Sequence, residues 1–128
     1  MISLNSTLRK LRVVLAGAIT TNQLDCTAQY RDIRVQKGDM SYGANVVATN
    51  SGTIVVLVEA PQSGMIREVF TISIYNKDTA NATVSIYYTD DATNYIVGKF
   101  TLSPGDSLLY SDEHGWACFN SAGDRKVS

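Results

Sequence analysis

Apolar and polar side chains alternate along most of this chain. In residues 68–76 (EVFTISIYN), Phe70, Ile72 and Ile74 are separated by single residues, and residues 82–90 (ATVSIYYTD) repeat the pattern. A period of two places successive side chains on opposite faces of a β-strand, and β-branched and aromatic residues fit such a half-buried surface. A period of 3.6 is nowhere sustained for long enough to form a helix of ordinary length. The pattern therefore predicts an all-β protein.

About eight short strands follow from this pattern. The polar linker NKDTANA joins residues 68–76 to residues 82–90 and indicates an antiparallel hairpin, and the C-terminal half resembles a meander. Turns recur near the spacing of about 8–12 residues that is typical of a sandwich or barrel. We expect a single domain with an antiparallel β-sandwich or jelly-roll-like fold. The other strands are expected at residues 8–16, 24–35, 52–60, 95–102, 107–111 and 116–120.

Glycine and proline mark several of the connections. The PGD sequence predicts a type II turn, in which Pro104 fixes φ and Gly105 takes a positive φ. The DEHG sequence predicts a second turn, with Gly115 as its flexible position, and Gly98 indicates a bulge or a close approach. Residues 37–52, which are rich in Gly, Asn and Ser, are expected to form a long exposed loop.

The two ends of the chain differ from its middle. We expect residues 1–24 to form an N-terminal strand or arm, residues 25–121 the β-sandwich, and residues 122–128 a loose C-terminal tail. Basic residues before the apolar run VVLAGAI resemble a signal peptide, but the run is short and follows a polar start, so no cleavage and no membrane span are expected. Residues 4–24 are expected to contact other molecules as well, because terminal arms commonly anchor subunits.

Composition narrows the choice of partners. The 128 residues carry eleven Lys and Arg against twelve Asp and Glu, for a net charge of −1 and a pI near 5.7. Such a balance provides no field to attract phosphate backbones or anionic lipids, so neither nucleic acid nor a membrane is an expected partner.

One short stretch holds a serine, an acid and the only histidine of the chain. Ser111, Asp112 and His114 have the side chains of a hydrolytic triad, but neighbours on an extended strand point apart. A working triad needs the base within hydrogen-bond reach of the nucleophile. We therefore interpret these residues as turn residues, and we predict no catalytic residue and no enzymatic activity.

Metal and cofactor sites are also not expected. Cys26 and Cys118 lie far apart in sequence and outside any CxxC pair, so burial as small apolar residues is favoured, with a disulfide left open. Asp90, Asp91 and Asn94 offer oxygen ligands, but Ca²⁺ takes about six to eight of them and the sequence lacks the D-x-D-x-D-G order. No cofactor is predicted.

Four tyrosines are candidates for a carbohydrate or partner surface, because the side chain combines a flat apolar ring with a polar tip. Cross-strand packing within a sheet explains two of them, Tyr75 and Tyr87, equally well. The other two candidates are Tyr30 and Tyr42.

Several stretches together resemble a family of small structural proteins of tailed bacteriophages. They are LAGAITTNQL at residues 15–24, the Ala60–Pro61 element, IYNKDTANATV at residues 74–84, LSPGDSLLYSDEHGW at residues 102–116, and NSAG at residues 120–123. The resemblance covers most of the chain. Cys26, Cys118 and residues 37–52 depart from the family pattern.

This resemblance implies a non-enzymatic, virion-associated protein. It would decorate the capsid or belong to the tail or a fibre, would contact other virion proteins, and would form a homo-oligomer that follows the symmetry of the particle. It would be found in the virion, and in the host cytoplasm during assembly. A receptor- or carbohydrate-binding β module of a tail fibre or spike is the alternative.

Overall fold

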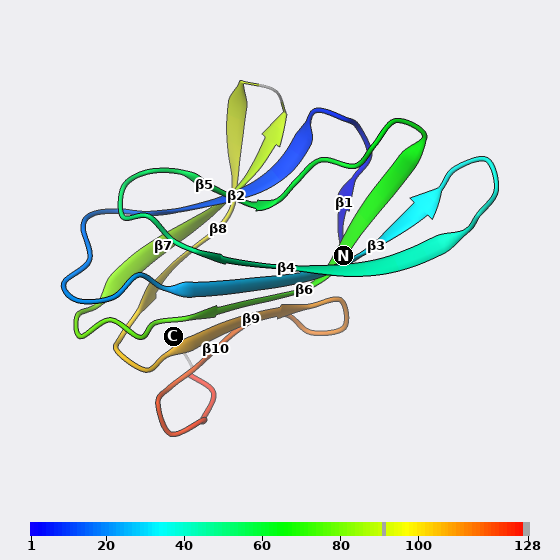
Figure 1. The fold of residues 1–128 in the computed structure, drawn as a ribbon. Helices are drawn as coiled ribbons and strands as arrows, with labels where there is room; N and C mark the ends of the chain where they lie inside the picture. Colours follow the sequence, from blue (N-terminus) through cyan, green and yellow to red (C-terminus); the bar gives the residue numbers. More distant parts are fainter. Residues whose placement is uncertain (91, 127–128) are drawn as a thin grey trace.

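Two antiparallel β-sheets stacked face to face form this protein (Figure 1). The structure is a computed structural model, and it describes residues 1–90 and 92–126. The predicted all-β sandwich is confirmed, with ten strands in the described residues in place of about eight. The strands are β1 (Ile2–Leu4), β2 (Arg9–Leu15), β3 (Asp25–Arg34), β4 (Met40–Ala48), β5 (Val55–Val58), β6 (Met65–Tyr75), β7 (Ala82–Asp90), β8 (Thr93–Leu102), β9 (Ser107–Ser111) and β10 (Gly115–Phe119).

The six-stranded sheet has the order β10-β9-β6-β3-β4, and β1 also pairs with β6. One side of β6 pairs along its length with β3, while its other side is shared between β1 and β9. The four-stranded sheet has the order β5-β2-β7-β8. Among the described residues, the edge strands of the two sheets are therefore β1, β4, β5, β8 and β10.

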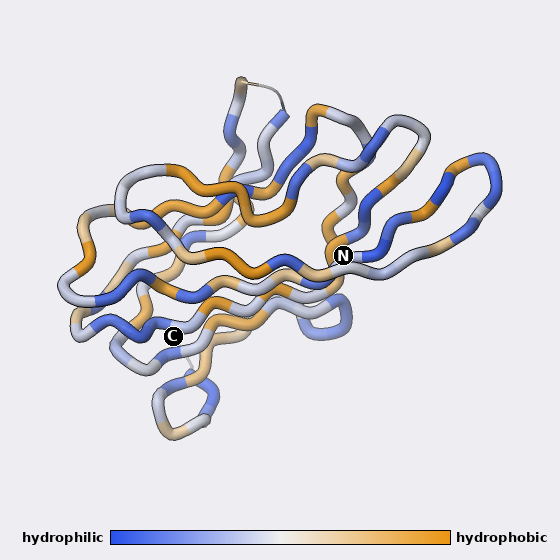
Figure 2. The backbone as a smooth tube through the Cα atoms, in the orientation of Figure 1, coloured by the Kyte–Doolittle hydropathy of each residue, from blue (hydrophilic) through white to orange (hydrophobic). Residues whose placement is uncertain are grey.

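The core lies between the two sheets and is built from alternate positions of their strands. Each large aliphatic side chain that is fully buried contributes about 1.5–3 kcal/mol relative to an exposed one. Figure 2 shows the corresponding apolar segments in both layers. The fully buried side chains include Leu11, Val13 and Ile86 from the four-stranded sheet and Cys26, Val69, Ile74 and Leu108 from the six-stranded sheet.

The expected hairpin between residues 68–76 and 82–90 is wrong. Its first strand, β6, lies in the six-stranded sheet and its second, β7, lies in the four-stranded sheet, so the linker crosses from one layer to the other. The chain crosses again after β8, which also breaks the expected meander. Alternation shows that a segment is a strand, but it does not show which strand it pairs with. The buried side chains of Asn76 and Asp78, within the linker, make the crossing possible by bonding to neighbouring backbone.

The exposed loop expected over residues 37–52 is also wrong, because β4 occupies most of it and pairs with β3 along nine residues. Gly43 in this strand is not a loop signal. The ring of Tyr30 covers it, and a Cβ at Gly43 would lie 2.7 Å from that ring. In β-sheets, an aromatic ring on the neighbouring strand can cover a glycine and shield its exposed backbone.

The N-terminal segment of residues 1–24 forms two strands of this same sandwich. β2 lies between β5 and β7, and Leu4, Leu11, Leu15 and Leu24 are buried in the common core. Its contacts with other molecules stay a prediction. Within residues 1–90 and 92–126, no helix has the length and apolar character needed to cross a membrane.

The described part of the C-terminal tail, residues 122–126, folds back onto β10. The Lys126 amide donates to the Cys118 carbonyl at 2.7 Å, and its ammonium lies 2.7 Å from the Asp106 carboxylate. These bonds hold Lys126 against β10 and the Ser103–Asp106 turn, within the segment that the sequence predicts as a tail. Val127 and Ser128 lie outside the described residues.

The turns follow the glycine signals. Gly105 has a φ of 84° and Gly115 a φ of 66°, and the Asp106 amide donates to the Ser103 carbonyl as a four-residue turn requires. The pairing of β7 with β8 shifts after Ile86, which stands opposite Gly98, and a Cβ at Gly98 would lie 2.6 Å from the Phe100 ring. The bulge and the close approach that were the two alternatives for Gly98 are therefore both present.

Candidate interaction surface

The six-stranded sheet turns one broad face away from the core, and we call it the outer face. A row of residues paired across all five strands of the main path, from β4 to β10, runs over its centre. Small side chains occupy the middle of this row, so another molecule can approach the backbone closely. In order across the strands the row is Val46, Thr27, Ser73, Leu109 and Ala117.

Apolar side chains on this face are exposed to solvent. Val46 is 70% exposed, Leu109 39% and Tyr75 43%. Single exposed apolar residues are ordinary, but these share one surface with small Ser, Thr and Ala side chains and few charges. A surface of this kind favours contact with another protein.

The outer face is hollowed where β6, β9 and β10 meet. A depression of about 510 Å³ lies over these strands, and its lining includes Ser73, Leu109, Ala117, Phe119 and Arg125. A second depression of about 300 Å³ shares Thr71, Ser111 and His114 with the first and continues toward Phe70. Together they form one shallow groove, which we call the outer groove.

Ser111, Asp112 and His114 lie at the rim of this groove, in the β9–β10 turn. The Ser111 hydroxyl oxygen accepts the backbone amide of His114 at 3.2 Å, which is a turn contact. The His114 side chain is 78% exposed, and its Nε2 lies 3.7 Å from Glu113. Asp112 lies 3.5 Å from the N-terminal ammonium of Met1 instead of behind the imidazole. The three side chains are therefore arranged as turn residues.

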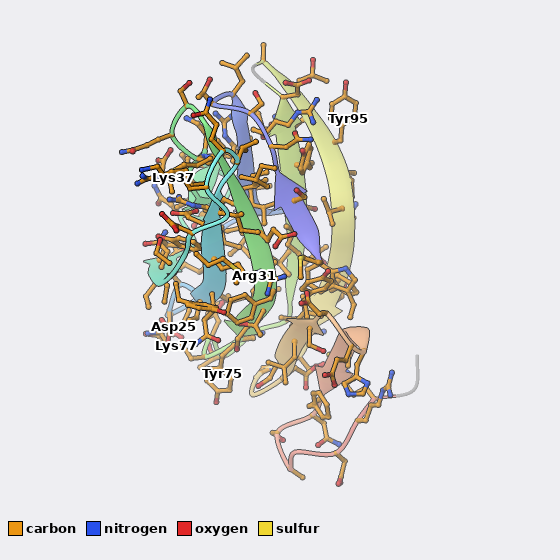
Figure 3. All side chains as sticks on the ribbon, turned by 90° about the vertical axis from the view of Figure 1, so that its right-hand side faces the viewer. Asp25, Arg31, Lys37, Tyr75, Lys77 and Tyr95 are labelled. Atoms are coloured by element: carbon orange, nitrogen blue, oxygen red, sulfur yellow. The ribbon has the colours of Figure 1, made fainter. Side chains whose placement is uncertain are left out.

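Ion pairs lie at both ends of the outer face. Lys77 and Asp25 approach within 3.0 Å beside Tyr75, and Figure 3 shows these three residues together at one end of the sheet. Arg31 and Glu68 lie 2.7 Å apart, and the hydrogen bond to Glu68 raises the pKa of the Arg31 guanidinium. Each of these charges has its partner within the chain. The apolar part of the outer face lies between the two ion pairs.

Both cysteines are free thiols. Burial, together with the nearby Asp25 charge, raises the pKa of the Cys26 thiol to about 12. Burial, followed by the charge of Asp106, also raises the pKa of Cys118. Raised pKa values keep thiols protonated, and protonated thiols are poor nucleophiles and poor metal ligands.

The oxygen ligands considered for Ca²⁺ have other partners. Asp90 pairs with Arg9 at 3.8 Å, and Asn94 accepts a hydrogen bond from the Thr89 hydroxyl at 2.7 Å. Asp91 lies outside the described residues. In the described part of the chain, no three His, Cys, Asp or Glu side chains gather as a metal site would require.

The four candidate tyrosines do not form one surface. Tyr87 belongs to the four-stranded sheet, whereas Tyr30 lies against Gly43 and stacks with Arg67, whose guanidinium carbon is 4.1 Å from the ring centroid. Tyr42 meets Phe70 edge-on at 6.2 Å. Tyr75 alone lies beside the ion pair at the end of the outer face.

β4, which contributes to the outer face, is not among the strands that the sequence predicts. The signal was present, because Met40, Tyr42, Ala44, Val46 and Ala48 alternate with other residues through β4. The glycine and asparagine within the strand concealed this alternation.

Known proteins provide no family for the chain. No protein-family model matches it, and neither a curated protein nor a solved structure matches it significantly.

Proposed function

We propose that this chain is a non-enzymatic structural protein of a bacteriophage virion, which docks on other virion proteins through its outer face. It would decorate the capsid or belong to the tail, and would be present as symmetry-related copies. It would be located in the virion, and in the host cytoplasm during assembly.

The observation that carries the proposal is the outer face itself. It joins exposed Val46 and Leu109 to a groove of about 510 Å³ over β6, β9 and β10. The side chains between them are small, so a partner can fit closely and displace water from apolar area, which is the main favourable term in association.

The sequence resemblance supplies the kind of assembly. The family motifs include IYNKDTANATV, which contributes the end of β6 at Ile74 and Tyr75, and LSPGDSLLYSDEHGW, which contributes the whole of β9 in the outer face. A particle protein needs a rigid module with repeated interfaces, and a two-layer sandwich serves that purpose without a cofactor.

The test uses particles of the virus that encodes the chain. Mass spectrometry of purified particles should detect the protein. Particles assembled with Leu109→Arg should lose it, because the guanidinium would enter the centre of the contact. Ile96→Arg is the matched control, since Ile96 is an exposed apolar residue of the other sheet, at 62%. Absence of the parent protein from the particles, or equal incorporation of both variants, would refute the proposal.

A receptor- or carbohydrate-binding module is the second candidate. Its support is the same groove, whose lining includes the aromatic Phe119 and Arg125. Tyr75 lies across β9 from Phe119, because both residues pair with Ser107. Aromatic rings with a polar rim are typical of ligand sites. Two results together would favour this function: the protein binds a glycan and Phe119→Ala loses that binding, and the protein is absent from purified capsids.

A further inference from the structure

The open edge of β4 has backbone groups that await a partner strand. Among the described residues, β4 pairs with β3 on one side and with no strand on the other. The Thr49 amide donates to the Leu24 carbonyl at 3.0 Å, and the Arg34 amide donates to the Asp39 carbonyl at 2.9 Å. Between these two bonds, all nine residues of β4 pair with β3 without a shift in register. Antiparallel pairs alternate between bonded and non-bonded residues, so the odd-numbered residues of β4 bond to β3. The even-numbered residues therefore direct their amides and carbonyls to the open edge.

The same even-numbered residues carry apolar side chains that point to solvent. Met40 is 56% exposed, Tyr42 69% and Val46 70%, and Ala44 and Ala48 complete the stripe. β4 has no charged residue and no proline. Figure 2 shows hydrophobic colour on β4 near its connection to β5 and a hydrophilic tip at the β3–β4 hairpin. A long, uncharged, apolar edge strand invites pairing unless something covers it.

The other edge strands of the sandwich carry features that discourage pairing. β8 has a bulge at Gly98 and an exposed Lys99. β10 is covered at its end by the tail, where Arg125 bridges to Phe119. β1 is only three residues long, and β5 is only four residues long with an interrupted register to β2. Bulges, lysines, short strands and covering segments are the usual protections of sheet edges. β4 has nine residues, no lysine and no bulge, and it contacts β5 through the inward-facing Asn45 side chain, which donates to the Leu57 carbonyl at 2.7 Å.

We propose that the open edge of β4 binds the β4 strand of a second copy of this chain, in antiparallel pairing about a two-fold axis. A second copy of the chain would thus be one partner in the proposed structural role, on which this inference rests. Pairing would join two six-stranded sheets into one continuous sheet and extend the outer face across both copies.

The register of this pairing follows from the strand. Only an axis through Ala44 pairs all nine residues of β4, from Met40 to Ala48, with those of the second copy. Outward-facing residues then stand opposite one another, and Tyr42 of each copy faces Val46 of the other. An aromatic residue opposite a β-branched one is a favourable cross-strand pair.

Charge and rigidity also favour a second copy. Because β4 has no charged side chain, no like charges would stand opposite one another across the axis. Tyr42 is already held by its edge contact with Phe70, and Gly43 by the ring of Tyr30. The strand would therefore lose little freedom on pairing.

The first experiment measures self-association of the purified full chain by sedimentation equilibrium. The parent protein should dimerise, and Val46→Lys should weaken the dimer by about tenfold or more, because a lysine on an edge strand opposes pairing. Ile96→Lys is the matched control on the β8 edge and should dimerise as the parent does. Circular dichroism verifies that each variant is folded.

The second experiment fixes the register and does not depend on a destabilising change. Ala44→Cys should form a disulfide-linked dimer under mild oxidation, because directly opposed residues of antiparallel strands have Cα atoms about 5.5 Å apart or less, within disulfide range. Thr101→Cys on β8 should not, and the parent protein provides the baseline for its own Cys26 and Cys118.

A parent chain that stays monomeric, a folded Val46→Lys variant that dimerises normally, or equal cross-linking of both cysteine variants would overturn the inference. These measurements use purified protein alone. A failure here is therefore distinct from a failure of the particle experiment, which concerns Leu109 and the other virion proteins.

Discussion

The two ends of the sandwich are held together by different kinds of interaction. At one end, which we call the linker end, the chain crosses between the sheets at residues 16–24, 49–54, 76–81 and 103–106. There, buried polar side chains bond to backbone groups of neighbouring linkers. At the opposite end, which we call the open end, Arg67 forms an ion pair with Asp32. Its guanidinium also stacks on the ring of Tyr30 and donates to the Glu59 carbonyl. Asn76, Asp78 and Asp106 at the linker end are at most 4% exposed, whereas the Arg67 and Asp32 side chains at the open end are each 15% exposed.

Asn76 and Asp78 connect the crossings at the linker end. The Asn76 side-chain amide donates to the Leu102 carbonyl at 2.9 Å and to the Ala80 carbonyl at 3.1 Å, and its oxygen accepts the Asp78 amide. The Asp78 carboxylate accepts the amides of Thr20 and Thr21 at 2.8 and 2.7 Å. The linker after β6 is thereby tied both to the end of β8 and to the linker after β2.

The largest effect is expected when the linker end loses Asn76. This residue is fully buried, and Asn76→Ala would leave the Ala80 and Leu102 carbonyls and the Asp78 amide without their partner. Buried groups without partners cost free energy, so the variant should lose about 2–4 kcal/mol of unfolding free energy in urea denaturation. Asn81→Ala, an exposed residue of the same linker, should change it by less than about 0.5 kcal/mol. Similar losses in the two variants would contradict the comparison.

A somewhat smaller loss is expected at the Ser103–Asp106 turn of the same end. Gly105 has a φ of 84°, and a Cβ there would lie 2.7 Å from the Ser121 Cβ. Gly105→Val should therefore cost about 2–3 kcal/mol through backbone strain and overpacking, measured as a lower melting temperature. Gly52→Ala serves as the control, because no atom lies within 4 Å of its added Cβ. An unchanged melting temperature in Gly105→Val would show that the turn has another geometry.

Acid should weaken the linker end through Asp78. The backbone amide of Thr20, with those of Thr21, Asn22 and Thr79, holds the pKa of this carboxyl well below its ordinary value of 3.8. A depressed pKa in the folded state contributes stability that is fully present above the ordinary value and is lost as pH falls through the folded one. Unfolding free energy should therefore decline as pH is lowered below about 4. Asp78→Asn should lose that part of the acid dependence, and parallel pH curves would refute the assignment.

The open end should tolerate the loss of its ion pair better. The Arg67 guanidinium meets both oxygens of Asp32 at 2.8 and 3.0 Å, and each side chain is 15% exposed. Arg67→Met keeps much of the packing on Tyr30, so we expect a loss of about 1–2 kcal/mol in thermal unfolding. The double variant with Asp32→Asn should recover part of it, because the remaining charge is removed. A loss larger than that of Asn76→Ala would reverse the comparison.

The smallest effect is expected at His114, which belongs to neither end. Its side chain is 78% exposed and serves a turn. His114→Ala should change the unfolding free energy by less than about 0.5 kcal/mol. Loss of a defined enzymatic activity in this folded variant would restore a catalytic function to the Ser111–His114 turn.

The sequence by itself determined where most strands and turns lie. Alternation marked β6, β7 and β8, and glycines marked the turns at Gly105 and Gly115, because a strand's two faces and a positive φ are local properties. The turn at His114 followed from the spacing of Ser111, Asp112 and His114. Side chains so close in sequence on an extended chain point apart and cannot form a triad.

Only the tertiary structure decided which strands pair and which surfaces stay open. β6 and β7 are consecutive, yet they lie in different sheets, because Asn76 and Asp78 satisfy a crossing linker through contacts with residues distant in sequence. The outer groove, likewise, exists because β6, β9 and β10 come side by side. Pairing partners and surface shape depend on long-range contacts, whereas residue patterns report only what each segment prefers locally.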